Sequence, residues 1–176
     1  MRRQTLSVKI GKVFIGSEHS IKTQSMTTAS TMDTNQSVDE AIKIINAGGK
    51  LVRFTAPNIN EAKNLLNIKK ALVEKGYDNP LVADIHFTPN AAIVAASVVE
   101  KVRINPGNYA DRKKFETHEY TDSSYQRELD RISTRFLPLI KVCKENGTSM
   151  RIGANHGSLS DRVLSRYGDT PMGMVE

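Results

Sequence analysis

Short apolar runs with a period of two alternate along the chain with longer segments whose apolar residues recur every three or four positions. Residues 80–107 show this most clearly, because a strand, a helix and a second strand follow one another there. Two polar residues interrupt each strand, Asp84 and His86 in the first. In the second they are Arg103 and Asn105. Since residues two positions apart share one face of a strand, each pair should point to the same side of a sheet.

The same alternation continues on both sides of this stretch. The predicted elements are a hairpin over 5–16, strands within 21–26, 50–56, 80–87, 101–107 and 149–154, and helices ending at Gly48, over 60–75, after Thr88, and over 123–146. Thr88 and Pro89 supply a cap and a first-turn proline for the helix between the two central strands. Every connection between the five strands is a crossover, which predicts a parallel sheet with helices outside it.

Three local signals predict where helices begin or are interrupted. Ser37 and Glu40 fit a capping box at the start of the first helix. Ser158 and Asp161 fit a second one, and a helix starting there would offer backbone donors to an anion. Pro138 lies inside the pattern of the last long helix, where it should kink the helix or split it in two.

The spacing of the strands indicates a barrel that this chain does not complete. Strand starts at residues 21 and 149 are four units apart, about 32 residues per unit, and eight such units need roughly 250 residues. We therefore expect the sequence to be a fragment of an α/β barrel with about five of eight units. The alternative is an open doubly wound sheet, but no G-x-G-x-x-G turn follows any strand.

Composition limits the chemistry and the partners. Lys and Arg number 25 against 19 Asp and Glu, and this net charge of +6 suits an anionic partner. The single cysteine, Cys143, excludes an internal disulfide, cannot hold a metal cluster alone, and lies on an apolar helix stripe that favours a buried, inert thiol. We predict no metal site in these residues. Neither a membrane span nor a secretory signal is visible, which predicts a cytoplasmic protein.

Three arginines are predicted to meet at one rim of the sheet. Arg53, Arg103 and Arg151 each lie towards the carboxyl end of a predicted strand, where parallel α/β folds keep their chemistry. A single arginine is more often a surface or salt-bridge residue, but three at one rim predict an anion clamp. The polar residues predicted beside them are Asp84, His86, Asn105 and Asn155. Among these, His86 and Asp84 are candidates to protonate or orient a substrate oxygen.

Two features leave alternatives open. Residues 106–122 have no period, so they are either a lid or binding loop or a disordered insertion. The positive charge also fits a phosphate-ligand or nucleic-acid-binding module without redox activity. Its one weak indication is the basic and aromatic stretch at 113–120.

Four motifs match one known family in order and spacing. They are QSMTT at 24–28, PLVADIHF at 80–87, RINPGN at 103–108 and RIGANHGSLSDR at 151–162. Over nearly its whole length the chain resembles the N-terminal barrel of the 4-hydroxy-3-methylbut-2-enyl diphosphate synthase family. The resemblance implies a TIM (β/α)8-type fold and an oxidoreductase of the non-mevalonate pathway of isoprenoid biosynthesis. That family reduces 2-C-methyl-D-erythritol 2,4-cyclodiphosphate by two electrons, opening its ring with loss of water.

The resemblance also implies residue roles. Carried over to this sequence, they are substrate binding for Arg53, Arg103, Asn105, Arg151 and Asn155, and catalysis for His86 and Asp84. Residues 1–176 would be the N-terminal part of a barrel domain that binds the substrate, inactive alone, in the longer form typical of plants and Bacteroidetes. The remaining barrel, an insert domain and the ligands of a [4Fe-4S] cluster would lie outside this chain. The resemblance further implies a flavodoxin or ferredoxin as electron donor, a homodimer, and no nucleic-acid or membrane partner.

Overall fold

The computed structural model describes residues 3–16, 18–111 and 118–176, and a sheet of five parallel strands forms its centre. The strands are β3 (Gln24–Met26), β4 (Leu51–Thr55), β5 (Leu81–Ile85), β6 (Lys101–Ile104) and β7 (Ser149–Ile152). They lie side by side in chain order, and each neighbouring pair is parallel. A doubly wound sheet reverses its strand order at a switch point, whereas a barrel keeps the chain order. The sheet is therefore an arc of a barrel, as the spacing predicted.

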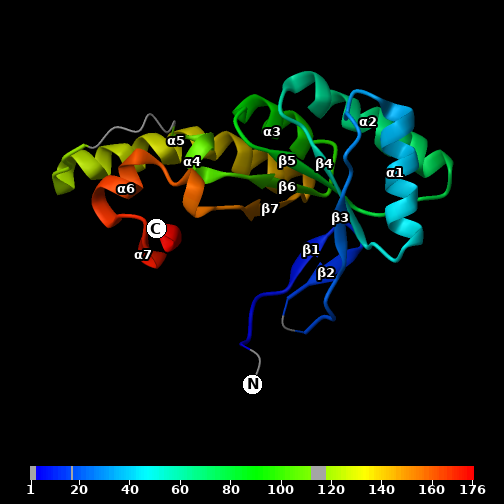
Figure 1. Cartoon of the computed structure of the whole chain (residues 1–176), viewed down its shortest axis with the longest axis horizontal. Helices are drawn as coiled ribbons and strands as arrows, with labels where there is room; N and C mark the ends of the chain where they lie inside the picture. The colour runs from blue at the N-terminus through cyan, green and yellow to red at the C-terminus, as the bar shows by residue number, and fades with distance from the viewer. Residues whose placement is uncertain (1–2, 17, 112–117) are drawn as a thin grey trace.

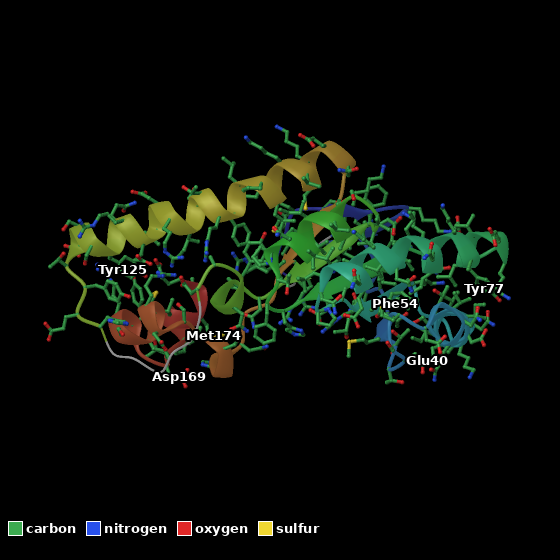
Figure 2. All side chains as sticks on the ribbon, turned by 90° about the horizontal axis from the view of Figure 1, so that it is seen from above. Glu40, Phe54, Tyr77, Tyr125, Asp169 and Met174 are labelled. Atoms are coloured by element: carbon green, nitrogen blue, oxygen red, sulfur yellow. The ribbon has the colours of Figure 1, made fainter. Side chains whose placement is uncertain are left out.

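Four helices connect the strands and cover one face of the sheet (Figure 1). They are α1 (Thr34–Asn46), α2 (Ile59–Glu74), α3 (Pro89–Ala96) and α5 (Asp122–Asn146). Phe54 of β4 is fully buried against this helical layer (Figure 2), together with Leu65 and Ile68 of α2. Because strand side chains alternate, the residues on either side of Phe54 face the other side of the sheet, the inner face of the barrel.

An antiparallel hairpin, β1 (Val8–Ile10) and β2 (Val13–Ile15), lies below the sheet in Figure 1. This confirms the hairpin predicted over residues 5–16. Ile10 is fully buried against Leu51 and Val82, which stand near the beginnings of β4 and β5. The hairpin therefore covers the amino ends of the strands, and the carboxyl ends stay open at the opposite rim.

Short helices occupy the connections at that open rim. They are α4 (Pro106–Tyr109), the 3-10 helix η1 (His156–Ser158), α6 (Asp161–Tyr167) and α7 (Pro171–Val175). In Figure 2 Tyr125 lies between α5 and α6, and the guanidinium carbon of Arg166 is 4.3 Å from its ring centroid. Part of the aperiodic stretch 106–122 is thus helical, whereas residues 112–117 lie outside the described residues.

Both predicted capping boxes are wrong. Helix α1 begins earlier, and its cap is Asp33, whose side chain accepts from the backbone N–H three residues on at 3.0 Å. Ser37 is fully buried within the helix. Glu40 accepts instead from the backbone N–H groups of Thr28 and Ala29 in the loop after β3, at 2.7 and 3.1 Å. Glu40 therefore serves the backbone donors of a neighbouring loop and not those at the start of its own helix.

At the second site, α6 is capped by Ser160 rather than Ser158. Ser158 ends η1, and its hydroxyl accepts from the side-chain amide of Asn105 at 2.8 Å. No helix starts at Ser158 within the described chain, so the expected backbone donors are not supplied from there. Ser158 could cap a helix or bind Asn105 in the loop after β6, and the tertiary structure selects the contact with Asn105. A local motif does not contain that information.

The long helix α5 is not split at Pro138. Pro138 has no N–H to donate to the carbonyl four residues earlier in the helix. Both positions are exposed, so water can hydrogen-bond to that carbonyl instead. The opposite face packs Leu139 and Cys143 into the core, which confirms the predicted buried thiol. The helix ends at Gly147 in the left-handed conformation, with φ 66°, as the sequence predicted.

Thr88 is the cap residue of α3, but its hydroxyl donates to the carbonyl of Pro57.

Candidate functional site: an arginine cluster on the inner face

Hydrogen-bonding register places three of the predicted polar residues in one row across the inner face. Asp84 of β5 is the register partner of Arg103 on β6, and Arg103 is the partner of Arg151 on β7. Arg53 stands on the same face of β4, two residues before Thr55, the register partner of Asp84. The three arginines therefore share the inner face of the sheet, as the sequence predicted, but Arg53 lies one row nearer the amino ends of the strands than Arg103 and Arg151.

Asp84 is the centre of this cluster. Its side chain is 1% exposed, and each carboxylate oxygen accepts from a different arginine. Oδ2 accepts from Nη2 of Arg53, and Oδ1 accepts from Nη1 of Arg103 at 3.0 Å. A buried carboxylate requires such partners, because leaving it unpaired would cost several kcal/mol, of the order of 3–5. Asp84 thus fixes two guanidiniums relative to each other.

The three arginines differ in how many of their N–H donors are hydrogen-bonded within the protein. Arg103 is 8% exposed at its side chain and also donates from Nη2 to the carbonyl of Gly153 at 2.7 Å. Arg53 is 24% exposed, and its Nε is buried without a hydrogen-bond partner among the described residues. Arg151 is exposed and forms no ion pair with any residue that the structure describes. The cluster therefore retains donors that no protein acceptor in this part of the chain uses.

A fourth cation, Lys101, was not among the predicted site residues. It stands two residues before Arg103 on the same face of β6 and is buried. Burial lowers the pKa of Lys101, and the positive charges of Arg151 and Arg53 lower it further. The spacing of two from Arg103 was visible in the sequence. A lysine in the first position of a strand nevertheless looks like an ordinary polar flank.

The histidine and asparagines of the prediction lie at the same rim but differ in their contacts. His86 is half-buried, and its Nε2 is 3.8 Å from Oδ2 of Asp84, which is beyond hydrogen-bond distance. Asn105 is buried and caps α4, with Oδ1 accepting from the backbone N–H of Gly107 at 3.1 Å. Its amide donates to Ser158, so Asn105 joins the loops after β6 and β7. Asn155 is exposed in the loop after β7.

A cavity of about 740 Å³ lies between the loops after β5 and β6 and helices α5 and α6. Thr88, Asn108, Arg131 and Arg162 are among its lining residues, whereas none of the three clustered arginines lines it. Both of these lining arginines already pair with Asp111, at 2.5 and 3.3 Å. This cavity is therefore a separate feature in which charge is largely compensated.

The inner face carries more positive charge than its own carboxylate can balance. Arg53, Lys101, Arg103 and Arg151 stand against Asp84 alone among the described strand residues of this face. Guanidinium groups that share one buried carboxylate and keep free donors are suited to phosphate oxygens. Among the described helices, none is long and apolar enough to cross a membrane.

Comparison with known proteins agrees with this geometry. The model of the GcpE TIM-barrel domain matches residues 5–176. The chain belongs to this family. The GcpE fold confirms that the five-stranded arc is part of a TIM barrel and not of a doubly wound sheet.

Three relatives show how the GcpE domain of this chain relates to longer proteins. Proteins of Bacteroides thetaiotaomicron and Parabacteroides distasonis, both named 4-hydroxy-3-methylbut-2-en-1-yl diphosphate synthase (flavodoxin), are 55% and 56% identical to it, and each alignment covers 99% of this chain. A chloroplastic protein of Arabidopsis thaliana with the same name but the suffix ferredoxin is 50% identical over 100% of this chain. The chain spans 29% of the length of the first two relatives and 24% of the third.

Proposed function

We propose that this chain forms part of the substrate pocket of a 4-hydroxy-3-methylbut-2-en-1-yl diphosphate synthase. The substrate would be 2-C-methyl-D-erythritol 2,4-cyclodiphosphate, whose diphosphate binds at the arginine cluster. Residues 1–176 would be the N-terminal part of the barrel domain, and the rest of the barrel and the other domains would come from outside these residues. The observation that carries the proposal is the excess of cations over carboxylates on the inner face.

A diphosphate suits this face in charge and in geometry. Arg53 and Arg151 keep donors that no described acceptor uses, so an incoming anion would not have to displace the contacts of Asp84 with Arg53 and Arg103. Arg151 is exposed and would swing onto the anion at little cost. The unpartnered Nε of Arg53 also calls for an acceptor. A ligand with several phosphate oxygens supplies such acceptors.

The proposed roles of the other residues follow from their contacts. Asp84 orients the two arginines, since neither of its oxygens is free to face a substrate. His86, half-buried at the rim, would protonate the departing oxygen as a general acid. Asn105 and Asn155 would border the same pocket, with Asn105 acting mainly through the loops that it joins.

The reduction needs two electrons, and a [4Fe-4S] cluster would supply them in the whole enzyme. The residues of this chain do not fit such a cluster. It has one cysteine, Cys143, which is buried, and burial raises the pKa of its thiol. No group of three metal-ligating side chains occurs among the described residues. We therefore place the cluster ligands outside these 176 residues.

The proposed partners rest on the names of the relatives and on the resemblance. A flavodoxin or a ferredoxin would donate the electrons, as the names of the relatives indicate for those proteins. A homodimer and a cytoplasmic location remain predictions.

The proposal predicts that the arginines control the use of the cyclic diphosphate. In the full-length enzyme, R53A, R103A and R151A should each lower kcat/KM about ten- to a hundredfold, because each removes charge-assisted hydrogen bonds worth about 1.5–3 kcal/mol. Lys63→Ala is the control, because Lys63 is exposed on α2 in the helical layer. Steady-state kinetics with the cyclic diphosphate measure the effect.

Wild-type kinetics in all three arginine variants would contradict the clamp. A salt titration of RNA binding by the same proteins tests the alternative module. A nucleic-acid site predicts binding that falls steeply with salt and that weakens when exposed lysines are removed.

A further inference from the structure

Gly153 follows β7 directly and is buried against the guanidinium of Arg103. A Cβ at this position would lie 1.9 Å from Nε, 2.7 Å from Cζ and 2.8 Å from Nη2 of Arg103. Real Cβ atoms do not approach other heavy atoms this closely. The arginine therefore occupies the space that any other residue at 153 would fill.

The backbone itself does not require a glycine here. Gly153 is not among the glycines with positive φ, in contrast to Gly147 and Gly168. Its N–H donates to the carbonyl of Ile104 at 2.8 Å and so extends the parallel pairing of β6 and β7. The backbone therefore does not call for the left-handed region that favours glycine, and the three heavy atoms nearest to an added Cβ all belong to Arg103.

The strand is fixed more firmly than the arginine. Gly153 uses its N–H in the sheet and its carbonyl as the acceptor for Nη2 of Arg103 at 2.7 Å. Arg103 has a long side chain, and its Nη1 donates a second hydrogen bond to Oδ1 of Asp84 at 3.0 Å. A methyl group at 153 would therefore move the guanidinium out of its place and leave the backbone where it is.

We propose that Gly153 is a positioning residue for the arginine cluster: its missing side chain makes the space in which Arg103 is held between Asp84 and the carbonyl of residue 153. The inference rests on the proposed function, in which Arg103 contacts the diphosphate. Gly153 acts only through Arg103 and touches no substrate. This role explains why a glycine stands at the end of β7, although its backbone does not have the positive φ that favours glycine.

A double-mutant cycle in the full-length enzyme tests this coupling. The variants are G153A, R103A and the double variant, with G157A as the matched control, because a Cβ at Gly157 in the same loop meets no atom within 4 Å. G153A should raise KM for the cyclic diphosphate about tenfold with kcat nearly unchanged, the pattern of lost uniform binding. In the R103A background, Gly153→Ala should cause no further loss. G157A should behave as wild type.

Each other outcome overturns a specific step. Equal losses from Gly153→Ala in both backgrounds would mean a general structural role and would overturn the inference. Wild-type KM in G153A beside an impaired R103A would overturn it as well, while the proposed function would stand. Wild-type KM in R103A would overturn both. If G153A does not fold, R103A should restore folding by removing the clash, and a double variant that still fails to fold would refute the proposal.

Discussion

At the scale of single residues, the arginine cluster combines two guanidiniums fixed by the protein with one that is not. Arg103 is held by Asp84 and Gly153, and Arg53 is held by Asp84. Arg151 stands in the same row, exposed and without an ion-pair partner among the described residues. Such an arrangement pre-orients part of an anion site before the ligand arrives, which lowers the entropy lost on binding. Arg151 would be ordered only by the ligand.

Glu40 offers a test of pH dependence away from the cluster (Figure 2). Hydrogen bonds from the backbone N–H groups of Ala29 and Thr28 lower the pKa of Glu40 below its ordinary value of 4.5. The folded state thus favours the carboxylate, so this stabilisation is complete above about pH 4.5 and is lost as the pH falls through the lowered pKa. In the full-length protein, E40Q should lower the free energy of unfolding at pH 7 by about 1 kcal/mol, after allowance for solvent screening.

Thermal unfolding of E40Q and wild type between pH 3 and pH 8 measures this effect. The difference between the two proteins should shrink as the pH falls below 4.5. Glu74→Gln removes an exposed carboxylate at the end of α2 and is the control for the loss of one negative charge. A constant gap between E40Q and wild type at every pH would contradict the assignment.

The sequence revealed those site residues that break a pattern. Asp84, Arg103 and Arg151 are charged residues within apolar strand runs, so the period of two assigned them to the inner face. Lys101 and Gly153 were missed because a lysine at a strand start and a glycine after a strand are ordinary flanking residues. The contact of Gly153 with Arg103 joins two strands, and only the register of the sheet defines it.

At the scale of elements, the loops after β6 and β7 are joined by a second close glycine contact. A Cβ at Gly107 would lie 1.9 Å from the carbonyl oxygen of Ser158. This neighbour is backbone and cannot move aside as Arg103 can. Gly107→Ala should therefore destabilise the full-length protein by about 1–3 kcal/mol, a typical cost of overpacking.

The matched comparison for G107A is again G157A, which should keep the wild-type thermal midpoint. The loss of stability in G107A should be the same with and without the R103A substitution, in contrast to the coupled effect expected at Gly153. An unchanged midpoint in G107A would show that the two loops can separate without cost.

The hairpin, the five parallel strands and the four helices between them were predicted correctly because these segments have a clear period, whereas their ends and the short helices at the rim depended on tertiary contacts. Ser37 and Glu40 fit the capping-box motif, yet Asp33 caps α1 and Glu40 accepts hydrogen bonds from the neighbouring loop. Pro138 was expected to kink α5 or to split it in two, and the helix is not split there. Motifs that involve one or two hydrogen bonds are easily overruled by packing.

At the scale of the whole molecule, the arc places its chemistry at one end. The hairpin covers the amino ends of the strands through Ile10, so the open carboxyl rim is where a ligand can approach. The helical layer buries one face of the sheet, while the inner face keeps its arginines. In a closed barrel this inner face would be surrounded by further strands, which would lower the local dielectric constant and strengthen the binding of an anion.

The open arc also predicts how these 176 residues behave alone. Strands β3 and β7 are the two ends of the five-stranded sheet, and they expose Met26 (45%) and Ile152 (56%). Unpaired edges with apolar residues promote association between chains, so the isolated chain should self-associate. Sedimentation velocity over a range of concentrations measures this. Ile152→Lys should reduce the association, because a charge on an edge strand opposes pairing, whereas Leu66→Lys on the outer surface of α2 should not. A monodisperse monomer that melts cooperatively would contradict this expectation and would show that the arc is stable without the rest of a barrel.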